Sequence, residues 1–137
     1  MTPAILFLEK HKATFTLHQY ECSTLDDFGA HAAKQLKVPL AQVFKTLLTE
    51  GEQGVVVALV PSSGKVNLKR LAKAAGVKKL DMMPPAKAER LTGYKVGGIS
   101  PFAQKKRLPT VLDASAKDYP HILVSGGKRG LSVAVAA

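Results

Sequence analysis

Two apolar runs on either side of a short turn constrain the fold more than any other feature of this 137-residue sequence. Val43-Phe44-Lys45-Thr46-Leu47-Leu48 is followed by a polar, glycine-bearing turn at Glu50–Gly54 and then by Val55–Val60. Two such runs around a short turn predict a β-hairpin. Because apolar residues are nearly continuous in both runs, we expect the hairpin to be buried on both of its faces.

Helical and strand patterns both occur in the rest of the chain. Helices are expected at 4–12, 26–37, 68–75 and 86–92, and further strands at 14–20, 110–113, 121–124 and 131–135. This order predicts one α/β domain over residues 1–137, with a mixed sheet of about six or seven strands flanked by helices. Cys22 is the only cysteine, which excludes an intramolecular disulfide and favours a reducing, cytoplasmic location. The sequence also predicts no secretory signal and no membrane segment.

Positive charge is concentrated in the second half of the chain. The net charge is +10, with 20 Lys+Arg against 10 Asp+Glu. Residues 1–64 carry five basic and six acidic side chains, whereas residues 65–137 carry fifteen and four, so the two parts have charges of −1 and +11. A basic surface of this size favours a polyanionic partner, with nucleic acid first and an anionic membrane second. The alternative is a solvated basic face that serves solubility.

Two glycine-rich loops are candidates for ligand binding. In Gly93–Pro101, the pair Gly97-Gly98 leaves the backbone open to close approach, and a turn of this kind can present N–H groups to an oxygen-rich ligand. Ser125–Gly130 combines glycines with Lys128 and Arg129, which suits a phosphate or a carboxylate. The alternative for the first loop is a plain surface turn without a ligand, and the second loop is a weak signal when taken alone.

Lys45 is the strongest single candidate for a functional residue, because a charge within an apolar strand is costly to bury. It either reaches an edge or faces a pocket that needs a cation, and Thr46 should point to the opposite side of the strand. His18 and Cys22 have no second pair with which to complete a metal site, so no metal is expected. The remaining histidines form no arrangement typical of a hydrolytic triad.

Several blocks, in this order, resemble the YbaK family of bacterial Cys-tRNA(Pro)/Cys-tRNA(Cys) deacylases, which are related to the editing domain of prolyl-tRNA synthetases. The blocks are Thr2-Pro3-Ala4, Val43–Leu48, Thr92–Pro101, Gln104–Thr110 and Ser125–Leu131. The resemblance implies a mixed α/β domain on a curved, barrel-like sheet. It also implies a cytoplasmic enzyme that acts in trans on mischarged tRNA(Pro), with tRNA(Cys) as a second candidate, in a transient complex with prolyl-tRNA synthetase and without a cofactor.

The resemblance also implies roles for individual residues. Lys45 matches a strand lysine that contacts the terminal adenosine or its phosphate, and Gly97 and Gly98 are placed with it as catalytic positions. The substrate positions implied are Tyr20, Phe28, Thr46, Ile99, Ser100, Pro101, Ser125, Gly126 and Ser132. For tRNA phosphates we expect contacts from Lys105, Lys106, Arg107, Lys128 and Arg129. An aminoacyl ester is already activated, so positioning and oxyanion stabilisation suffice without a nucleophile from the enzyme.

Two departures from the family pattern leave alternatives open. Ser132 stands where the cysteine deacylases often have an acidic residue, which puts the preference for cysteine in question. Ala-tRNA(Pro) is therefore an alternative substrate. The chain also stops at Ala137, where family members usually continue with a helix, so one sheet face is expected to be either more open or covered by a partner. A non-catalytic tRNA-binding module is the third reading, against which the buried-strand position of Lys45 argues.

Overall fold

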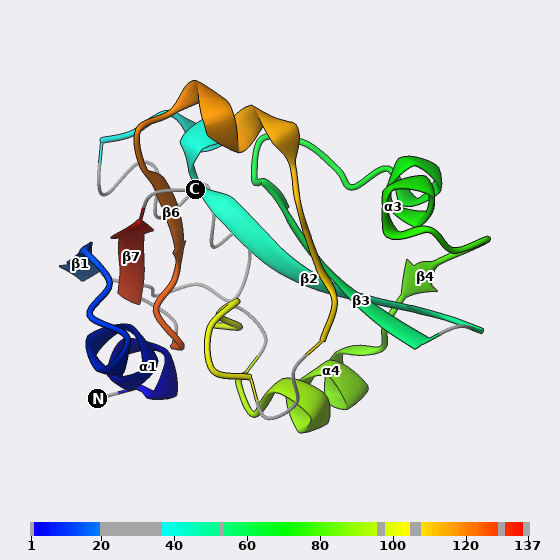
Figure 1. Cartoon of the computed structure of the whole chain (residues 1–137), viewed down its shortest axis with the longest axis horizontal. Coiled ribbons are helices and arrows are strands. Elements are labelled where there is room, and N and C mark those ends of the chain that lie inside the picture. The colour runs from blue at the N-terminus through cyan, green and yellow to red at the C-terminus, as the bar shows by residue number, and fades with distance from the viewer. Residues whose placement is uncertain are drawn as a thin grey trace.

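The computed structural model of the chain describes residues 2–19, 37–52, 54–95, 98–104, 108–128 and 131–135 (Figure 1). In chain order its elements are α1 (Pro3–Lys10), β1 (Phe15–Gln19), the 3-10 helix η1 (Leu40–Gln42), β2 (Phe44–Gly51), β3 (Gly54–Pro61), α3 (Leu68–Ala75), β4 (Asp81–Met82), α4 (Pro85–Thr92), β5 (Thr110–Leu112), the 3-10 helix η2 (Ala114–Asp118), β6 (Ile122–Ser125) and β7 (Leu131–Val135). The expected α/β class is confirmed. Residues 26–36 of one expected helix lie outside the described residues.

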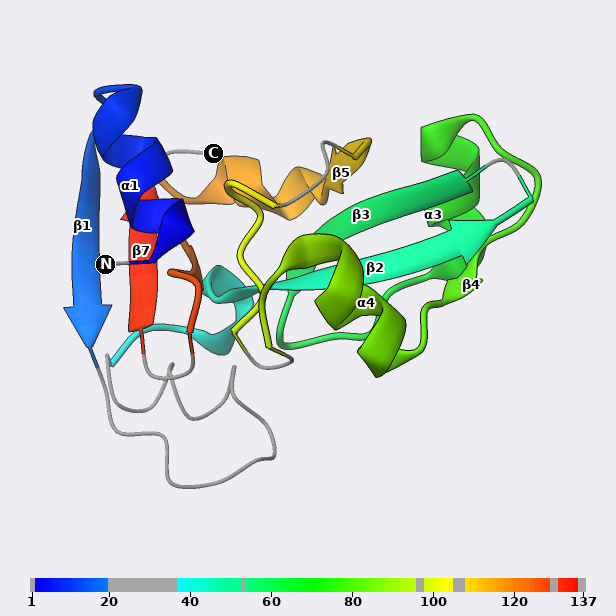
Figure 2. The same ribbon diagram turned by 90° about the horizontal axis from the view of Figure 1, so that it is seen from below.

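The described strands are divided between two sheets. A four-stranded sheet has the order β4-β2-β3-β5 and is here called the hairpin sheet, and a three-stranded sheet with the order β1-β7-β6 is called the terminal sheet. Figure 2 shows the terminal sheet beside α1 and the hairpin sheet extending away from it. The parallel β3–β5 pair makes the hairpin sheet mixed.

Among the described residues, one isolated parallel bridge, between Val43 and Leu123, connects the segment before β2 with β6. At the C-terminal end of β2, the short strand β4 pairs with it over two residues only. Neither of these short pairings continues into a closed ladder. The expectation of a single barrel-like sheet is not confirmed in this part of the chain.

The β2–β3 hairpin is buried on both faces, as its sequence predicts. Phe44, Leu48, Val57 and Leu59 lie on one face, where Ala4 and Leu8 of α1 and Ala88 of α4 pack against them. Val56 and Ala58 lie on the other face, against Leu71 and Ala72 of α3. Burial of each large aliphatic side chain contributes about 1.5–3 kcal/mol. The hairpin is thus the layer on which the three described α-helices pack.

Helix boundaries follow capping residues in the sequence. The Thr2 hydroxyl accepts the N–H of Ile5 at the start of α1, and the Asn67 side chain accepts the N–H of Arg70 at the start of α3. Gly93 ends α4 with a φ of 83°, a left-handed conformation that glycine adopts without strain. No helix in the described part of the chain is both long enough and apolar enough to cross a membrane.

Candidate functional site

The two glycine-rich loops that the sequence singles out lie against each other. Tyr94, in the first loop, and Thr2, before α1, both contact the second loop. A Cβ added to Gly127, whose φ is 106°, would lie 2.9 Å from Thr2 Cβ and 3.0 Å from Tyr94 Cε1. The Thr2 hydroxyl also donates a hydrogen bond to the carbonyl oxygen of Gly126. Only a residue without a side chain fits at this junction.

Hydrogen bonds within the first loop hold its described part in place. The Tyr94 hydroxyl donates to the Phe102 carbonyl oxygen at 2.6 Å. The Ser100 side chain, which is fully buried, accepts the Phe102 N–H at 3.2 Å. The Gly98 N–H donates to the Lys95 carbonyl oxygen at 2.8 Å. In this conformation the Gly98 amide is therefore engaged within the loop, and its donation to an ester stays a prediction.

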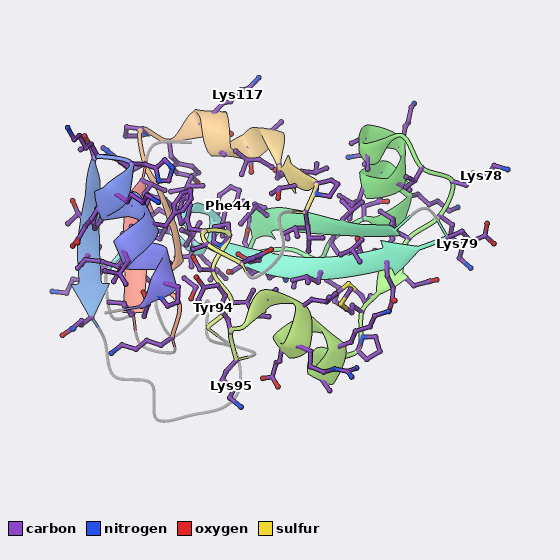
Figure 3. All side chains as sticks on the ribbon, turned by 60° about the horizontal axis from the view of Figure 1, so that its bottom comes forward. Phe44, Lys78, Lys79, Tyr94, Lys95 and Lys117 are labelled. Carbon is purple, nitrogen blue, oxygen red and sulfur yellow. The ribbon has the colours of Figure 1, made fainter. Side chains whose placement is uncertain are left out.

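Burial also raises the pKa of the Tyr94 hydroxyl. Its side chain is 4% exposed, and desolvation raises the pKa of its hydroxyl to about 12, partly offset by a hydrogen bond with the Ala4 backbone. The hydroxyl therefore stays protonated even in mildly alkaline solution, and it donates to the Phe102 carbonyl oxygen. Figure 3 shows Tyr94 turned into the interior, whereas the neighbouring Lys95 reaches into solvent.

The second loop begins at the end of β6 and returns into β7. The Ser125 hydroxyl accepts the Gly127 N–H at 3.1 Å, and the Gly126 N–H donates to the Leu131 carbonyl oxygen at 2.8 Å. Ser132 lies directly opposite Ser125 in the β6–β7 register and is 4% exposed. Lys128, at the tip, is exposed. The loop thus places two serines side by side behind an exposed cation.

Lys45 and Thr46 point to opposite faces of the hairpin sheet, as the strand period requires. Thr46 shares its face with Phe44 and Leu48, which is also the face on which Tyr94 and Ile99 pack. The Thr46 hydroxyl oxygen is buried and has no hydrogen-bond partner among the described residues. Buried hydroxyls without a partner are uncommon, so this one is a candidate contact for a bound ligand.

The Lys45 ammonium lies on the α3 side of the hairpin sheet. Its Nζ donates to the Gly64 carbonyl oxygen at 2.8 Å, and its side chain is partly exposed. Three protons on the ammonium leave further donors for a ligand. The structure therefore brings Thr46 and Ile99 to one side of the hairpin sheet and places Lys45 on the other. Ser100 and Pro101 follow Ile99 in the same loop.

Seven of the residues expected in the site lie outside the described residues: Tyr20, Phe28, Gly97, Lys105, Lys106, Arg107 and Arg129. In the sequence, Thr2 stood out only as part of a family block, and Tyr94 had no role of its own. The signal for Tyr94 was an aromatic residue directly after the glycine that ends a helix. Its contact with Gly127, 33 residues further along the chain, has no local signature.

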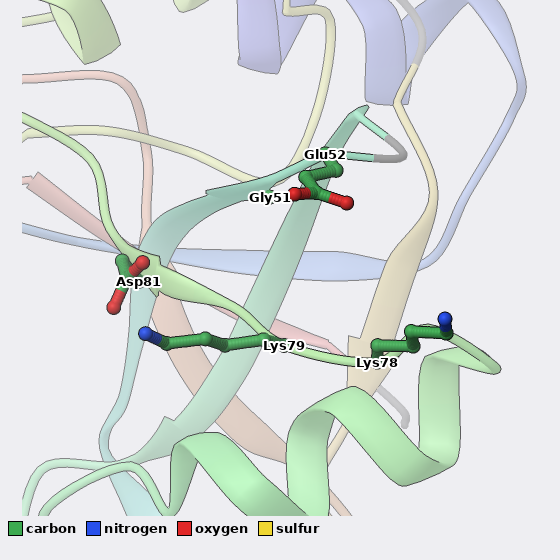
Figure 4. A pocket seen from close by; sticks show the side chains of 5 residues that line it. All are labelled: Gly51, Glu52, Lys78, Lys79 and Asp81. Atoms are coloured by element: carbon green, nitrogen blue, oxygen red, sulfur yellow. The ribbon is translucent and has the colours of Figure 1, made fainter.

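A separate hollow of about 230 Å³ lies at the β2–β3 turn, beside β4 (Figure 4). It is lined by Gly51, Glu52, Lys78, Lys79 and Asp81, and none of the residues expected in the site contributes to it. Within the described ranges no three His, Cys, Asp or Glu side chains are grouped so that they could hold a metal ion.

The aminoacyl-tRNA editing domain family matches residues 24–137, which is most of the chain. The chain belongs to this family, and the resemblance drawn from its sequence blocks is thereby confirmed. A relative from Enterococcus faecalis, named "Putative Cys-tRNA(Pro)/Cys-tRNA(Cys) deacylase EbsC", is 38% identical over 136 residues, covering 98% of this chain and 83% of the relative.

More distant similarities agree with this assignment. A proline–tRNA ligase from Listeria welshimeri is 21% identical over 127 residues, and the chain spans 22% of that enzyme's length. Among solved structures, a "putative trans-editing enzyme for prolyl tRNA synthetase" superposes with a TM-score of 0.85 at 24% identity, covering 98% of this chain and 84% of that one. A hypothetical protein gives a TM-score of 0.88 at 23% identity, with coverages of 98% and 88%. At these identities the structures establish the shared fold.

Proposed function

We propose that this protein is an aminoacyl-tRNA deacylase that hydrolyses the ester of mischarged tRNA, with Cys-tRNA(Pro) as the favoured substrate. The observation that carries the proposal is the 38% identity, over nearly the whole chain, to the relative named "Putative Cys-tRNA(Pro)/Cys-tRNA(Cys) deacylase EbsC". The contact between the two glycine loops supports it, because an enzyme without its own nucleophile depends on a rigid, shaped pocket.

The aminoacyl group is proposed to lie on the face of the hairpin sheet that carries Thr46. There the Thr46 hydroxyl would gain the hydrogen-bond partner that it lacks within the described residues. The first loop, held by Tyr94, would cover the group, and Ser125 and Ser132 would line its far side. Both serines are small and uncharged, which limits the space to a short side chain and leaves the α-amino group without an acidic partner from β7.

Lys45 is proposed to bind the terminal adenosine or its phosphate. Its ammonium is held by one carbonyl oxygen and is partly exposed, so it can donate further hydrogen bonds to a phosphate at the edge of the sheet. The exposed Lys128, with the sequence-predicted Lys105, Lys106, Arg107 and Arg129, would contact phosphates nearer the loops. A transient complex with prolyl-tRNA synthetase would deliver the mischarged tRNA.

A panel of charged tRNAs tests this proposal. Cys-tRNA(Pro), Ala-tRNA(Pro), Cys-tRNA(Cys) and Pro-tRNA(Pro) would be incubated with the protein, and ester loss followed against the spontaneous rate. We expect the fastest loss for Cys-tRNA(Pro) and none above background for Pro-tRNA(Pro). Faster loss of Ala-tRNA(Pro) would favour the second candidate, which rests on the neutral Ser132. If none of the esters were turned over, the proposal would be overturned, and the alternative of a non-catalytic tRNA-binding module would be favoured.

The role of Lys45 has its own test in the same assay. Lys45→Ala should abolish deacylation because it removes the proposed contact with the 3′ end of the tRNA. Lys117→Ala, which removes an exposed cation from η2, should retain activity and serves as the control. Equal activity of the Lys45→Ala protein and the wild type, with unchanged thermal unfolding, would show that Lys45 is not part of the site.

A further inference from the structure

An exposed basic surface surrounds α3, away from the two glycine loops. Between residues 54 and 80 the sequence contains six lysines or arginines and no aspartate or glutamate. All six side chains are exposed: Lys65, Lys69, Arg70, Lys73, Lys78 and Lys79. Glu52 and Asp81 line the hollow beside Lys78 and Lys79, so acidic groups border one end (Figure 4). The four cations at the other end, Lys65, Lys69, Arg70 and Lys73, are here called the α3 basic surface.

The fold holds this surface in a fixed orientation. Leu71 and Ala72 are buried against the hairpin sheet, which turns the opposite side of α3 to solvent. Asn67 caps the first turn, and Gly76, with a φ of 74°, ends the helix. The helix therefore presents Lys69, Arg70 and Lys73 outward on a short, rigid element. Figure 1 shows α3 at the end of the molecule opposite the terminal sheet.

The α3 basic surface continues toward the lysine assigned to the 3′ end of the substrate. Lys45 lies on the face of the hairpin sheet that α3 covers, and its Nζ donates to the carbonyl oxygen of Gly64. Gly64 directly precedes Lys65, the first cation of the surface. A polyanion that follows α3 would thus reach Lys45 without crossing an acidic side chain of the 54–80 segment.

We propose that the α3 basic surface binds the phosphate backbone of the tRNA acceptor arm and directs its 3′ end to Lys45. This inference rests on the proposed function and adds a second area of tRNA contact, separate from the loop cations. Phosphate contacts by lysine and arginine position a nucleic acid without reading its sequence. Such contacts suit a domain whose specificity is for the amino acid attached to the tRNA.

The chemistry of α3 favours RNA over an anionic membrane. Helices that lie in a membrane interface combine basic residues with exposed large apolar or aromatic side chains. The outward side of α3 has none, because Leu71 is buried and Ala74 is the only apolar residue among the exposed residues of α3. The surface therefore offers charge without an apolar anchor.

The test compares two triple variants of the whole protein that lose the same charge. The first is Lys69→Gln/Arg70→Gln/Lys73→Gln, in which glutamine keeps a good helix propensity. The matched control is Lys10→Gln/Arg90→Gln/Lys117→Gln, which removes three exposed cations from other elements. Binding of uncharged tRNA(Pro) would be measured by fluorescence anisotropy between 50 and 300 mM salt, and thermal unfolding would confirm that both variants fold.

We expect the α3 variant to bind tRNA about 10- to 100-fold more weakly near 0.15 M salt. The plot of the logarithm of the association constant against log salt should become shallower. Its slope should decrease in magnitude by about two to three, close to 0.9 for each lost phosphate contact. The control should lose much less affinity and keep its slope. Equal losses in the two variants would overturn the proposal, as would tighter binding of the wild type to anionic phospholipid vesicles than to tRNA. Because uncharged tRNA is the probe, the result stands apart from whether any ester is turned over.

Discussion

Replacing Tyr94 with phenylalanine removes one hydroxyl from the place where the two glycine loops meet. The ring stays and keeps its contact with Gly127, but the Phe102 carbonyl oxygen loses a donor at 2.6 Å. The bond is partly buried, and loss of a typical hydrogen bond costs about 0.5–1.5 kcal/mol, so Tyr94→Phe should be less stable than the wild type by that amount at pH 8.

The same hydroxyl makes this difference depend on pH. The folded-state pKa of Tyr94 is raised from 10.0 to about 12, so its stabilising effect is complete below pH 10 and is lost as the pH rises through 12. At pH 11 the unfolded chain is ionised and the folded protein is not, which lowers wild-type stability by about 1.4 kcal/mol. Other titrating groups are common to both proteins and cancel in the difference.

Urea unfolding of both proteins at pH 8, 9, 10 and 11, at constant ionic strength, measures this effect. The stability advantage of the wild type should be constant up to about pH 9.5 and should shrink by about 1.4 kcal/mol at pH 11. An advantage that stays constant to pH 11, or the absence of any advantage at pH 8, would show that the Tyr94 hydroxyl does not hold the loop.

Two further substitutions test the junction and the pocket. Gly127→Ala should lower the free energy of unfolding by about 2–4 kcal/mol, because the new Cβ meets Thr2 and Tyr94 at a positive φ, whereas Gly64→Ala, with no neighbour within 4 Å, should be close to neutral in the same urea titration. Thr46→Val removes an unpaired buried hydroxyl, so it should raise stability by about 1 kcal/mol while lowering kcat/KM for the mischarged tRNA; a variant that is both less stable and fully active would contradict this placement.

Local patterns in the sequence account well for the individual elements. The nearly continuous apolar runs predict a hairpin covered on both faces, and α3 on one face and α1 with α4 on the other confirm it. The opposite orientations of Lys45 and Thr46 follow from the two-residue period of a strand. Proline and threonine at the start of α1, and glycine after α4, mark helix ends through backbone conformation and hydrogen bonding, which are local properties.

Contacts between distant segments could not be predicted in the same way. Nothing near Phe15 in the sequence indicates that β1 pairs with β7. The division of the seven described strands into two sheets depends on where each run of paired residues ends. The fit of Gly127 against Tyr94 and the use of the Gly98 amide within its own loop are tertiary features as well. The sequence therefore identified the loops but not the bonds that fix their shape.

The order of the terminal sheet has a consequence for how the chain folds as it is synthesised. Its middle strand, β7, spans Leu131–Val135, and β1 and β6 pair with β7 but not with each other. During translation β1 therefore leaves the ribosome more than a hundred residues before its partner, whereas the β2–β3 hairpin can close at once. In the nascent chain, Phe15–Gln19 therefore has no β7 partner until β7 emerges. Exposed strand edges of this kind favour aggregation, so we expect this stage to benefit most from chaperones.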